Sequence, residues 1–251
     1  MSENTIDGVS VEKGLKVEDF QFAYTSVWGD EKFAVKNINF QMEPGYIYGL
    51  VGRNGAGKTT LIESLLKGEY KKGHVSLNGV SMEDNPIQVK ENLGIMSYPA
   101  RLLQKETLQA NGELLGAIYA NWNQQEYEKK LKEFGLEKNQ MVKNLSNGET
   151  MKAQLAFIWG YKPQIVIADE PTSGLDPKFR KIFIRELQEY VEDGKHSVLF
   201  STHITEDLDQ VADFLLMLHE GRLICKGSLE ELRDYYNEDS FSVSWLLRKL
   251  T

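Results

Sequence analysis

Residues 52–59 read GRNGAGKT and match the phosphate-binding pattern G-x-x-x-x-G-K-[ST]. An apolar run at 46–51 precedes this phosphate loop, and residues 60–66 after it have helical character. Its glycines let the backbone curl, so that successive N–H groups and a helix N-terminus face one anion. Lys58 adds a positive charge for the β- and γ-phosphates, and the Thr59 hydroxyl suits Mg²⁺. The loop therefore predicts a buried strand, a tight turn and a helix around a phosphate group.

A second motif, IVIADE at 165–170, is an apolar run that ends in two acids. Asp169 stands where a buried strand ends, so its carboxylate can hold Mg²⁺ directly or through water. Glu170 follows and can orient and deprotonate an attacking water. Acids after an apolar run can also simply end a strand. Together with the phosphate loop, they indicate phosphoryl transfer to water.

Strand-like and helix-like patterns alternate along the rest of the chain. Residues 15–22 and 35–42 alternate apolar and polar side chains, as half-exposed strands do. Shorter runs typical of strands occur at 46–51, 75–77, 93–96, 165–168, 197–201 and 214–218. In the middle third, glycine and β-branched residues thin out, and we predict helices at 106–120, 124–134 and 148–160. Strands alternating with helices predict a parallel sheet covered by helices, with the helical middle inserted into it.

Composition narrows the class of protein. The 251 residues are 41% hydrophobic and carry a net charge of -8, which argues against a nucleic-acid surface. The single cysteine, Cys225, excludes an internal disulfide and fits a reducing cytosol. We find no signal-peptide pattern at the N-terminus and no apolar stretch near the roughly 18 residues of a membrane helix. If this protein moves something across a membrane, another chain must supply the channel.

Three more segments, read together with the phosphate loop, narrow the possible families of nucleotide-binding proteins. Residues 145–149 read LSNGE, which is similar to the signature LSGGQ of ATP-binding cassette (ABC) ATPases. DEPTSGLD at 169–176 resembles that family's catalytic acids and D-loop, and STH at 201–203 resembles its switch histidine. Tyr24 stands where the family keeps an aromatic side chain for adenine. In order and spacing, the resemblance covers residues 15–232.

The resemblance implies a fold class and a domain organisation. The fold is α/β: a P-loop NTPase of the ABC ATPase type, with a core parallel sheet, an antiparallel β edge and an inserted α-helical subdomain. We expect the ATPase domain at 15–234, the helical subdomain at about 90–162 and a C-terminal helical tail at 235–251. The tail resembles the ends of ABC-2-type exporter subunits. It can equally be a helix that packs Trp245, Leu246 and Leu250 on the core.

The resemblance also implies a site shared by two subunits that face each other head to tail. ATP would lie between the phosphate loop of one subunit and the signature of the other, with Asp176 in contact across the interface. His203 would contact the γ-phosphate and hold the water near Glu170, and Tyr24, or in its place Trp28 or Phe33, would stack on adenine. The residues implied to bind ATP are Tyr24, Gly52, Asn54, Gly55, Gly57, Lys58, Thr59, Thr60, Ser146, Gly148 and Asp176. Thr59 and Asp169 would be the Mg²⁺ ligands, and Glu170 and His203 the catalytic residues.

The chain departs from the family pattern at several positions. Asn147 replaces a signature glycine, and we expect it to keep a left-handed turn, which asparagine tolerates. Glu149 replaces glutamine and brings a negative charge near the phosphates, which weakens closure unless it points away or pairs. The family's glutamine after the strand at 93–96 is missing, with Tyr98 at about that position and Gln104 several residues late. Arg53 in the phosphate loop replaces a common proline without an expected effect.

We therefore expect an ATP-hydrolysing subunit that powers a membrane transporter, in particular an exporter. Its partners would be a transmembrane permease subunit and a second ABC ATPase, in a homodimer or a heterodimer, without nucleic acid. It would be cytoplasmic and bound to the cytoplasmic face of the membrane. The alternative is a soluble ABC ATPase of the iron–sulfur cluster assembly type, to which Glu149 gives some weight. Selectivity for cargo would reside in the membrane subunit.

Overall fold

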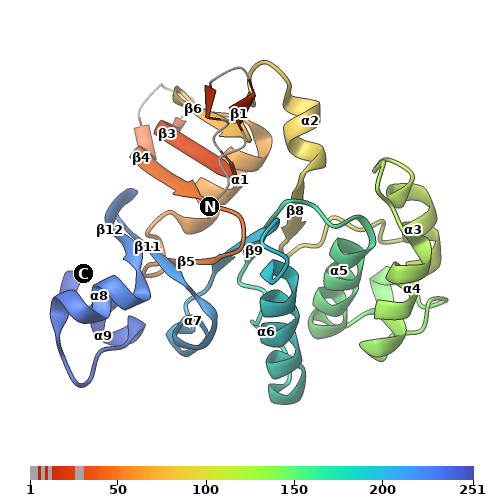
Figure 1. The fold of residues 1–251 in the computed structure, drawn as a ribbon. Coiled ribbons are helices and arrows are strands. Elements are labelled where there is room, and N and C mark those ends of the chain that lie inside the picture. Colours follow the sequence, from red (N-terminus) through yellow and green to blue (C-terminus); the bar gives the residue numbers. More distant parts are fainter. Residues whose placement is uncertain (1–4, 7–8, 11–12, 26–30) are drawn as a thin grey trace.

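A computed structural model describes residues 5–6, 9–10, 13–25 and 31–251. Its centre is a six-stranded sheet in the order β12-β11-β5-β10-β9-β8 (Figure 1). Neighbouring strands from β8 to β11 run parallel, and β12 pairs antiparallel with β11 at the edge. The strands are β5 (Ile47–Val51), β8 (Leu93–Met96), β9 (Ile165–Asp169), β10 (Ser197–Ser201), β11 (Phe214–His219) and β12 (Arg222–Ser228). The predicted parallel sheet is confirmed.

The central strands are continuously apolar because both faces of the sheet are covered. In β5, Tyr48 and Leu50 join one hydrophobic cluster, whereas Ile47 and Val51 join the other. Successive side chains of a strand point to opposite faces, so each strand supplies both clusters. The main sheet therefore lies between two hydrophobic clusters, and the loops at its strand ends start from a rigid core.

A second sheet with the order β4-β3-β6-β7 covers one face (Figure 1). It is antiparallel throughout, which confirms the predicted antiparallel edge. In β3, Leu15 and Val17 are buried between the sheets while Lys16 and Glu18 lie further out, as the alternating pattern predicted. The strands are β3 (Leu15–Thr25), β4 (Glu31–Met42), β6 (Lys72–Leu77) and β7 (Val80–Ser81), and β1 (Thr5–Ile6) pairs separately with β2 (Val9–Ser10).

The helices divide between the two faces. Residues of α1 (Lys58–Lys67) and α2 (Pro86–Glu91) pack with the antiparallel sheet. Residues of α5 (Asn147–Tyr161), α6 (Pro177–Val191) and α7 (Thr205–Val211) pack on the opposite face, as Figure 1 shows. Between β8 and β9 the chain forms α3 (Leu108–Gly116), α4 (Gln124–Glu133), a 3₁₀ turn (Val142–Asn144) and α5.

The helical segment differs from its predicted bounds at two places. Because β8 belongs to the main sheet, the helical part starts after Met96 rather than near residue 90. The first helix ends at Gly116, earlier than the predicted residue 120. After Gly116 the chain turns so that the Trp122 indole packs on this glycine and on Gly160, where an added Cβ would lie 2.2 Å and 2.4 Å from ring atoms. Only glycine fits at both contacts.

The chain after β12 forms α8 (Leu229–Tyr236) and α9 (Val243–Leu250). Val243 and Leu246 of α9 are fully buried, and Trp245 and Leu250 pack partly buried against the same cluster. The backbone N–H of Val243 donates to Asp209 Oδ1 of α7 at 2.8 Å, so α9 lies against α7. In the part of the chain that the structure describes, no helix combines the length and apolarity that spanning a membrane requires.

Candidate functional site

The predicted residues gather where the parallel strands end. β5, β10 and β9 are neighbours in the sheet, and the loops after them carry the phosphate loop, His203 and Glu170. Carboxyl ends of parallel strands form one edge, so segments distant in sequence meet there. They surround an open cavity of about 560 Å³ lined by Tyr24, Asn54, Gly55, Ala56, Gly57, Lys58, Thr59, Thr60, Glu170 and His203.

The phosphate loop has the backbone that its glycines predicted. Gly55 and Gly57 adopt positive φ angles of 81° and 108°, a region that side chains with a Cβ rarely enter. Gly52 is needed for a different reason, because an added Cβ would lie 2.3 Å from the Leu218 carbonyl oxygen. Helix α1 starts at Lys58, directly after Gly57, so its free N–H groups point into the cavity region. The loop has the shape of an anion site.

The Lys58 side chain folds back onto the first residue of the phosphate loop. Its Nζ donates to the Gly52 carbonyl oxygen at 2.8 Å, and the side chain is buried. Lysine has three N–H donors, so this bond leaves donors for a phosphate in the cavity. The ammonium is thereby positioned by the same loop whose N–H groups would bind the anion.

Thr59 and Asp169 meet as the sequence predicted for a metal pair. The Thr59 hydroxyl lies 3.0 Å from Asp169 Oδ2, although the residues are 110 positions apart. Asp169 Oδ1 and the Ser201 hydroxyl are both buried without a hydrogen bond of good geometry, and burial raises the pKa of the Asp169 carboxyl despite the nearby hydroxyls of Thr59 and Ser201. A buried carboxylate oxygen without a partner is costly unless a cation or water satisfies it. A hydroxyl, a carboxylate and phosphate oxygens are ligands that Mg²⁺ accepts, so these residues fit that ion.

No cluster of three or more histidine, cysteine or acidic side chains able to hold a metal occurs among the described residues.

Glu170 and His203 are in direct contact. Glu170 Oε2 lies 2.6 Å from His203 Nδ1 and also accepts the His203 backbone N–H at 3.2 Å. Glu170 has a positive φ of 50°, and its own N–H donates to the Ser201 carbonyl oxygen at 2.8 Å. A positive φ is uncommon for glutamate and is seen where the surroundings hold the backbone. The strained residue therefore points an acid at the cavity beside the histidine.

A buried polar network supports this pair, and the sequence analysis missed it. Asp207 of α7 is buried and accepts from the Thr172 hydroxyl at 2.7 Å and from the Arg180 guanidinium at 2.6 Å. Thr172 follows Glu170 by two residues, and Asp207 follows His203 by four. The network therefore joins the two loops that carry the acid and the histidine. The one sequence signal for this network was the pair of acids, Glu206 and Asp207, in the first turn of α7.

Tyr24 lies at the end of β3 on the cavity wall, with 44% of its surface exposed. Its ring lies nearly perpendicular to the Phe22 ring, with the two centroids 5.0 Å apart. Of the alternatives for the predicted adenine contact, Trp28 lies outside the described residues, and the Phe33 backbone pairs with Tyr24 in the β3–β4 ladder.

The signature lies apart from this cavity. Ser146 is the N-cap of α5, and Gly148 approaches the Gly174 carbonyl oxygen, 3.3 Å from where its Cβ would be. Asp176 is the N-cap of α6 and accepts the Phe179 N–H at 2.9 Å, a bond that lowers its pKa. Ser146, Gly148 and Asp176 therefore sit at two neighbouring helix starts that do not line the chain's own cavity.

Of the departures from the family pattern, Asn147 differs from our expectation. The left-handed turn expected at Asn147 is wrong, because Asn147 is the first residue of α5 and has no positive φ. Glu149 pairs: it forms a capping box with Ser146. The spacing S-x-x-E was a readable signal for this box. Arg53 is exposed.

Among the hydrogen bonds of the described residues, neither candidate for the missing glutamine has Thr59 or Asp169 as a partner. Tyr98 is 67% exposed, and Gln104 donates to the Leu102 carbonyl oxygen at 3.3 Å. Instead a buried glutamine of α5, Gln154, holds the backbone after β8: its amide bonds both the N–H and the carbonyl oxygen of Ser97, at 3.2 Å and 3.1 Å. It thus links the signature helix to this loop.

The fold and the site together define an α/β protein of the P-loop nucleotide-hydrolase class. Comparison with known proteins gives the family. The ABC transporter family model matches residues 35–173. The chain is 33% identical to the ABC transporter ATP-binding protein NatA of Bacillus subtilis (strain 168), over 85% of this chain and 88% of NatA. It is 30% identical to the ABC-type transporter ATP-binding protein EcsA of the same organism, over 94% of this chain and 96% of EcsA.

A solved structure described as the ATP binding subunit of an ABC transporter superposes with a TM-score of 0.84 and 27% identity. That match covers 95% of this chain and 99% of the other. The chain therefore belongs to the ABC transporter family, as an ATP-binding and ATP-hydrolysing subunit of a transporter. These relatives lend no support to the iron–sulfur assembly alternative, so the predicted transporter ATPase is confirmed.

Proposed function

We propose that this chain hydrolyses Mg²⁺-bound ATP in the cavity at the sheet edge and couples this to the movement of a membrane partner. Lys58 and the α1 N-terminus would hold the β- and γ-phosphates, while Thr59 and Asp169 would hold Mg²⁺, whose charge offsets that of the phosphates. Tyr24 would stack on adenine. The observation that carries the proposal is the convergence of Lys58, the Thr59–Asp169 pair and the Glu170–His203 contact.

For hydrolysis, Glu170 would act as general base toward a water beside the γ-phosphate. In this structure its carboxylate accepts two bonds from His203. When a γ-phosphate arrives, the imidazole and the carboxylate would hold the water between them and the phosphate. Most of the rate gain would come from this positioning and from charge neutralisation.

A second cassette would complete the site, because one chain leaves its cavity open. Ser146, Gly148 and Asp176 lie on a separate face, and in a head-to-tail pair that face would cover the partner's ATP. The start of α5 would present N–H groups to the γ-phosphate. The second cassette is a further copy of this chain or a related one.

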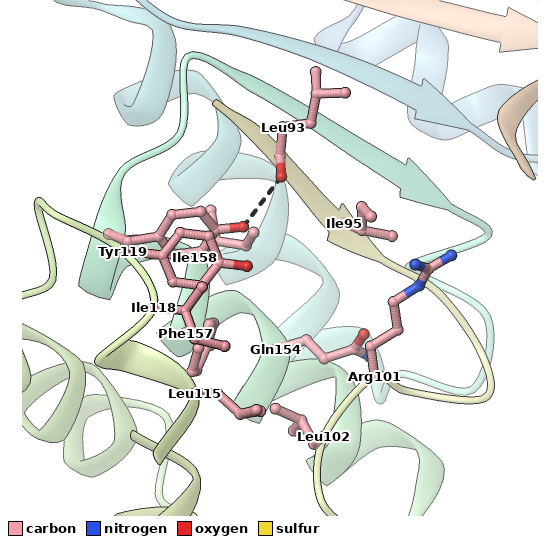
Figure 2. A pocket seen from close by; sticks show the side chains of 11 residues that line it. Leu93, Ile95, Arg101, Leu102, Leu115, Ile118, Tyr119, Gln154, Phe157 and Ile158 are labelled. Atoms are coloured by element: carbon pink, nitrogen blue, oxygen red, sulfur yellow. Dashed lines mark hydrogen bonds between the residues drawn. The ribbon is translucent and has the colours of Figure 1, made fainter. Parts of the chain in front are cut away.

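A membrane partner needs an apolar surface outside the ATP cavity, and one lies beside β8. A pocket of about 130 Å³ has Ile95 and Arg101 on one side and Ile118, Tyr119 and Phe157 on the other (Figure 2). Ile118 is 64% exposed, and clustered exposed apolar side chains mark interaction sites. We propose that a cytoplasmic segment of a transmembrane permease docks here, which places the chain on the cytoplasmic face. The tail resemblance favours an exporter.

The test is co-purification with tagged Glu170→Gln, which should bind ATP and hydrolyse it very slowly. From mild-detergent extracts with ATP and Mg²⁺, mass spectrometry should identify a multi-spanning membrane protein. Adding Ile118→Asp should release that protein without changing ATP affinity, whereas Tyr235→Asp, at an 81% exposed position on α8, should not. Recovery of soluble partners alone would contradict the membrane role, and turnover at the wild-type rate in Glu170→Gln would contradict the assigned base.

A further inference from the structure

An acid in the signature folds back on the signature serine. Glu149 Oε2 accepts hydrogen bonds from both the backbone N–H and the hydroxyl of Ser146, each at 2.8 Å. Ser146 Oγ in turn accepts the Glu149 backbone N–H at 3.2 Å. The two residues therefore satisfy each other at the start of α5, in a closed capping box.

This box uses the one hydrogen that the Ser146 hydroxyl possesses. A serine hydroxyl donates a single hydrogen bond, and here the carboxylate of Glu149 accepts it. A γ-phosphate offers acceptor oxygens and needs a donor. Ser146 can therefore donate to a phosphate only after its bond to Glu149 has opened.

The box also places a negative charge at the start of α5. Hydrogen bonds from the Ser146 backbone and hydroxyl lower the pKa of Glu149, assisted by nearby Lys152. The carboxylate thus already balances the positive end of the helix dipole. A second anion arriving at the same helix start meets a like charge, which opposes its binding.

We propose that Glu149 is a positioning residue that holds the Ser146 hydroxyl away from ATP and thereby weakens the ATP-driven closure of two cassettes. The inference rests on the proposed function, in which α5 of one copy faces the γ-phosphate bound by the other. In that arrangement Glu149 is an intramolecular competitor of the phosphate for Ser146. Glutamine at 149 retains an acceptor oxygen for the box but removes the charge, so it should favour closure.

The chain contains a matched control. At the start of α8, Ser228 and Glu231 form a second capping box: the Ser228 N–H donates to Glu231 Oε2 at 3.2 Å, and the Glu231 N–H donates to Ser228 Oγ at 3.0 Å. Neither residue belongs to the cavity or the signature. Glu231→Gln therefore makes the same chemical change, with the same loss of one negative charge, at a helix start outside the proposed interface.

The experiment measures ATP-dependent dimerisation by analytical ultracentrifugation in the Glu170→Gln variant, with Mg²⁺-ATP. Adding Glu149→Gln should tighten the dimer about tenfold, the effect of removing one nearby like charge, and adding Glu231→Gln should leave it unchanged. With Glu170 intact, Glu149→Gln should lower the KM for ATP more than it alters kcat. Thermal unfolding of both variants verifies that each helix start remains folded.

The outcomes separate this inference from the proposed function. If Glu170→Gln dimerises but Glu149→Gln leaves the dimer unchanged or weaker, the role of Glu149 is overturned. Equal tightening by Glu149→Gln and Glu231→Gln would also overturn it, since net charge would then be the cause. If Glu170→Gln forms no ATP-dependent dimer, the proposed pairing of two cassettes fails, and the inference fails with it.

Discussion

At the scale of single residues, the chemistry depends on side chains that neighbouring atoms hold in unusual positions. Lys58 is buried with its ammonium on the Gly52 carbonyl oxygen, and Glu170 keeps a positive φ beside His203. Both arrangements cost free energy, the first through desolvation of a charge and the second through backbone strain. They are understandable if the cavity receives an anion and a water that these residues contact.

Replacing Lys58 tests the phosphate role directly. Lys58→Ala removes a charged donor to phosphate, and hydrogen bonds to charged groups contribute about 1.5–3 kcal/mol. We expect ATP affinity to fall by about 10–100-fold in calorimetric titration. Lys67→Ala, at the exposed end of the same helix, should bind ATP as the wild type does. Unchanged affinity in Lys58→Ala would reject the assignment.

At the scale of elements, a buried ion pair joins the helical segment to the core. Lys130 Nζ of α4 lies 2.7 Å from Glu186 Oε2 of α6, and both side chains are buried. Lys130 also lies over the Trp159 ring of α5, 4.4 Å from its centroid. Burial lowers the pKa of Lys130, but its bonds to Glu186 and Glu133 outweigh this and raise it above the ordinary 10.5. A single lysine thus connects three helices.

Breaking this pair should destabilise the fold. Lys130→Met leaves the Glu186 carboxylate buried and unpaired, which costs about 3–5 kcal/mol, whereas Lys129→Met at an exposed site should cost little. Adding Glu186→Leu to Lys130→Met should restore much of the loss. Urea unfolding provides the free energies. A cost below about 1 kcal/mol for Lys130→Met would show that the pair is not coupled to folding.

The same pair predicts a pH dependence. Because the pKa of Lys130 is raised in the folded state, the folded chain binds this proton more tightly than the unfolded chain. The pair's contribution is complete below the unfolded value near 10.5 and is lost as the pH rises through the higher folded value. We expect the wild type to lose more stability above pH 10.5 than the Lys130→Met, Glu186→Leu variant. Parallel curves for the two proteins would contradict this.

At the scale of the whole molecule, the C-terminal helix is tied to the functional edge of the sheet. Helix α9 packs on α7 and is held by the Val243–Asp209 hydrogen bond. Helix α7 in turn follows His203 and carries Asp207, which bonds Thr172 and Arg180. The chain end therefore supports the helix that positions the switch histidine loop.

Truncating a buried side chain of α9 tests whether this helix contributes to the core. Leu246 has 0% exposure, and removing its side chain should cost about 2–5 kcal/mol through lost burial and an unfilled cavity. Tyr235→Ala, at an exposed position of α8, should cost less than about 0.5 kcal/mol. Urea denaturation provides both values, and ATP affinity should be unchanged in both variants. An equal, small cost at the two positions would show that α9 does not contribute to the core.

Short-range patterns predicted much of this architecture. The strand, loop and helix around residues 52–59, the acids at 169 and 170, and the three helices of the middle segment follow from periodicity and from residues close together in sequence. The capping box of Ser146 and Glu149 is equally local, because it spans a single helical turn. Such features could be predicted because the atoms that define them belong to neighbouring residues.

Other features depend on which strands become neighbours. The contact of Glu170 with His203 spans 33 positions, and Gln154 reaches Ser97 across 57. The order of the main sheet brings the ends of β5, β10 and β9 together and places β8 at the edge. Packing between distant segments decided these contacts and the pairing of Lys130 with Glu186. It also decided the end of α3 at Gly116, where the Trp122 ring packs against Gly116 and Gly160. No periodicity along the chain encodes them, since side chains distant in sequence meet only after the sheet has formed.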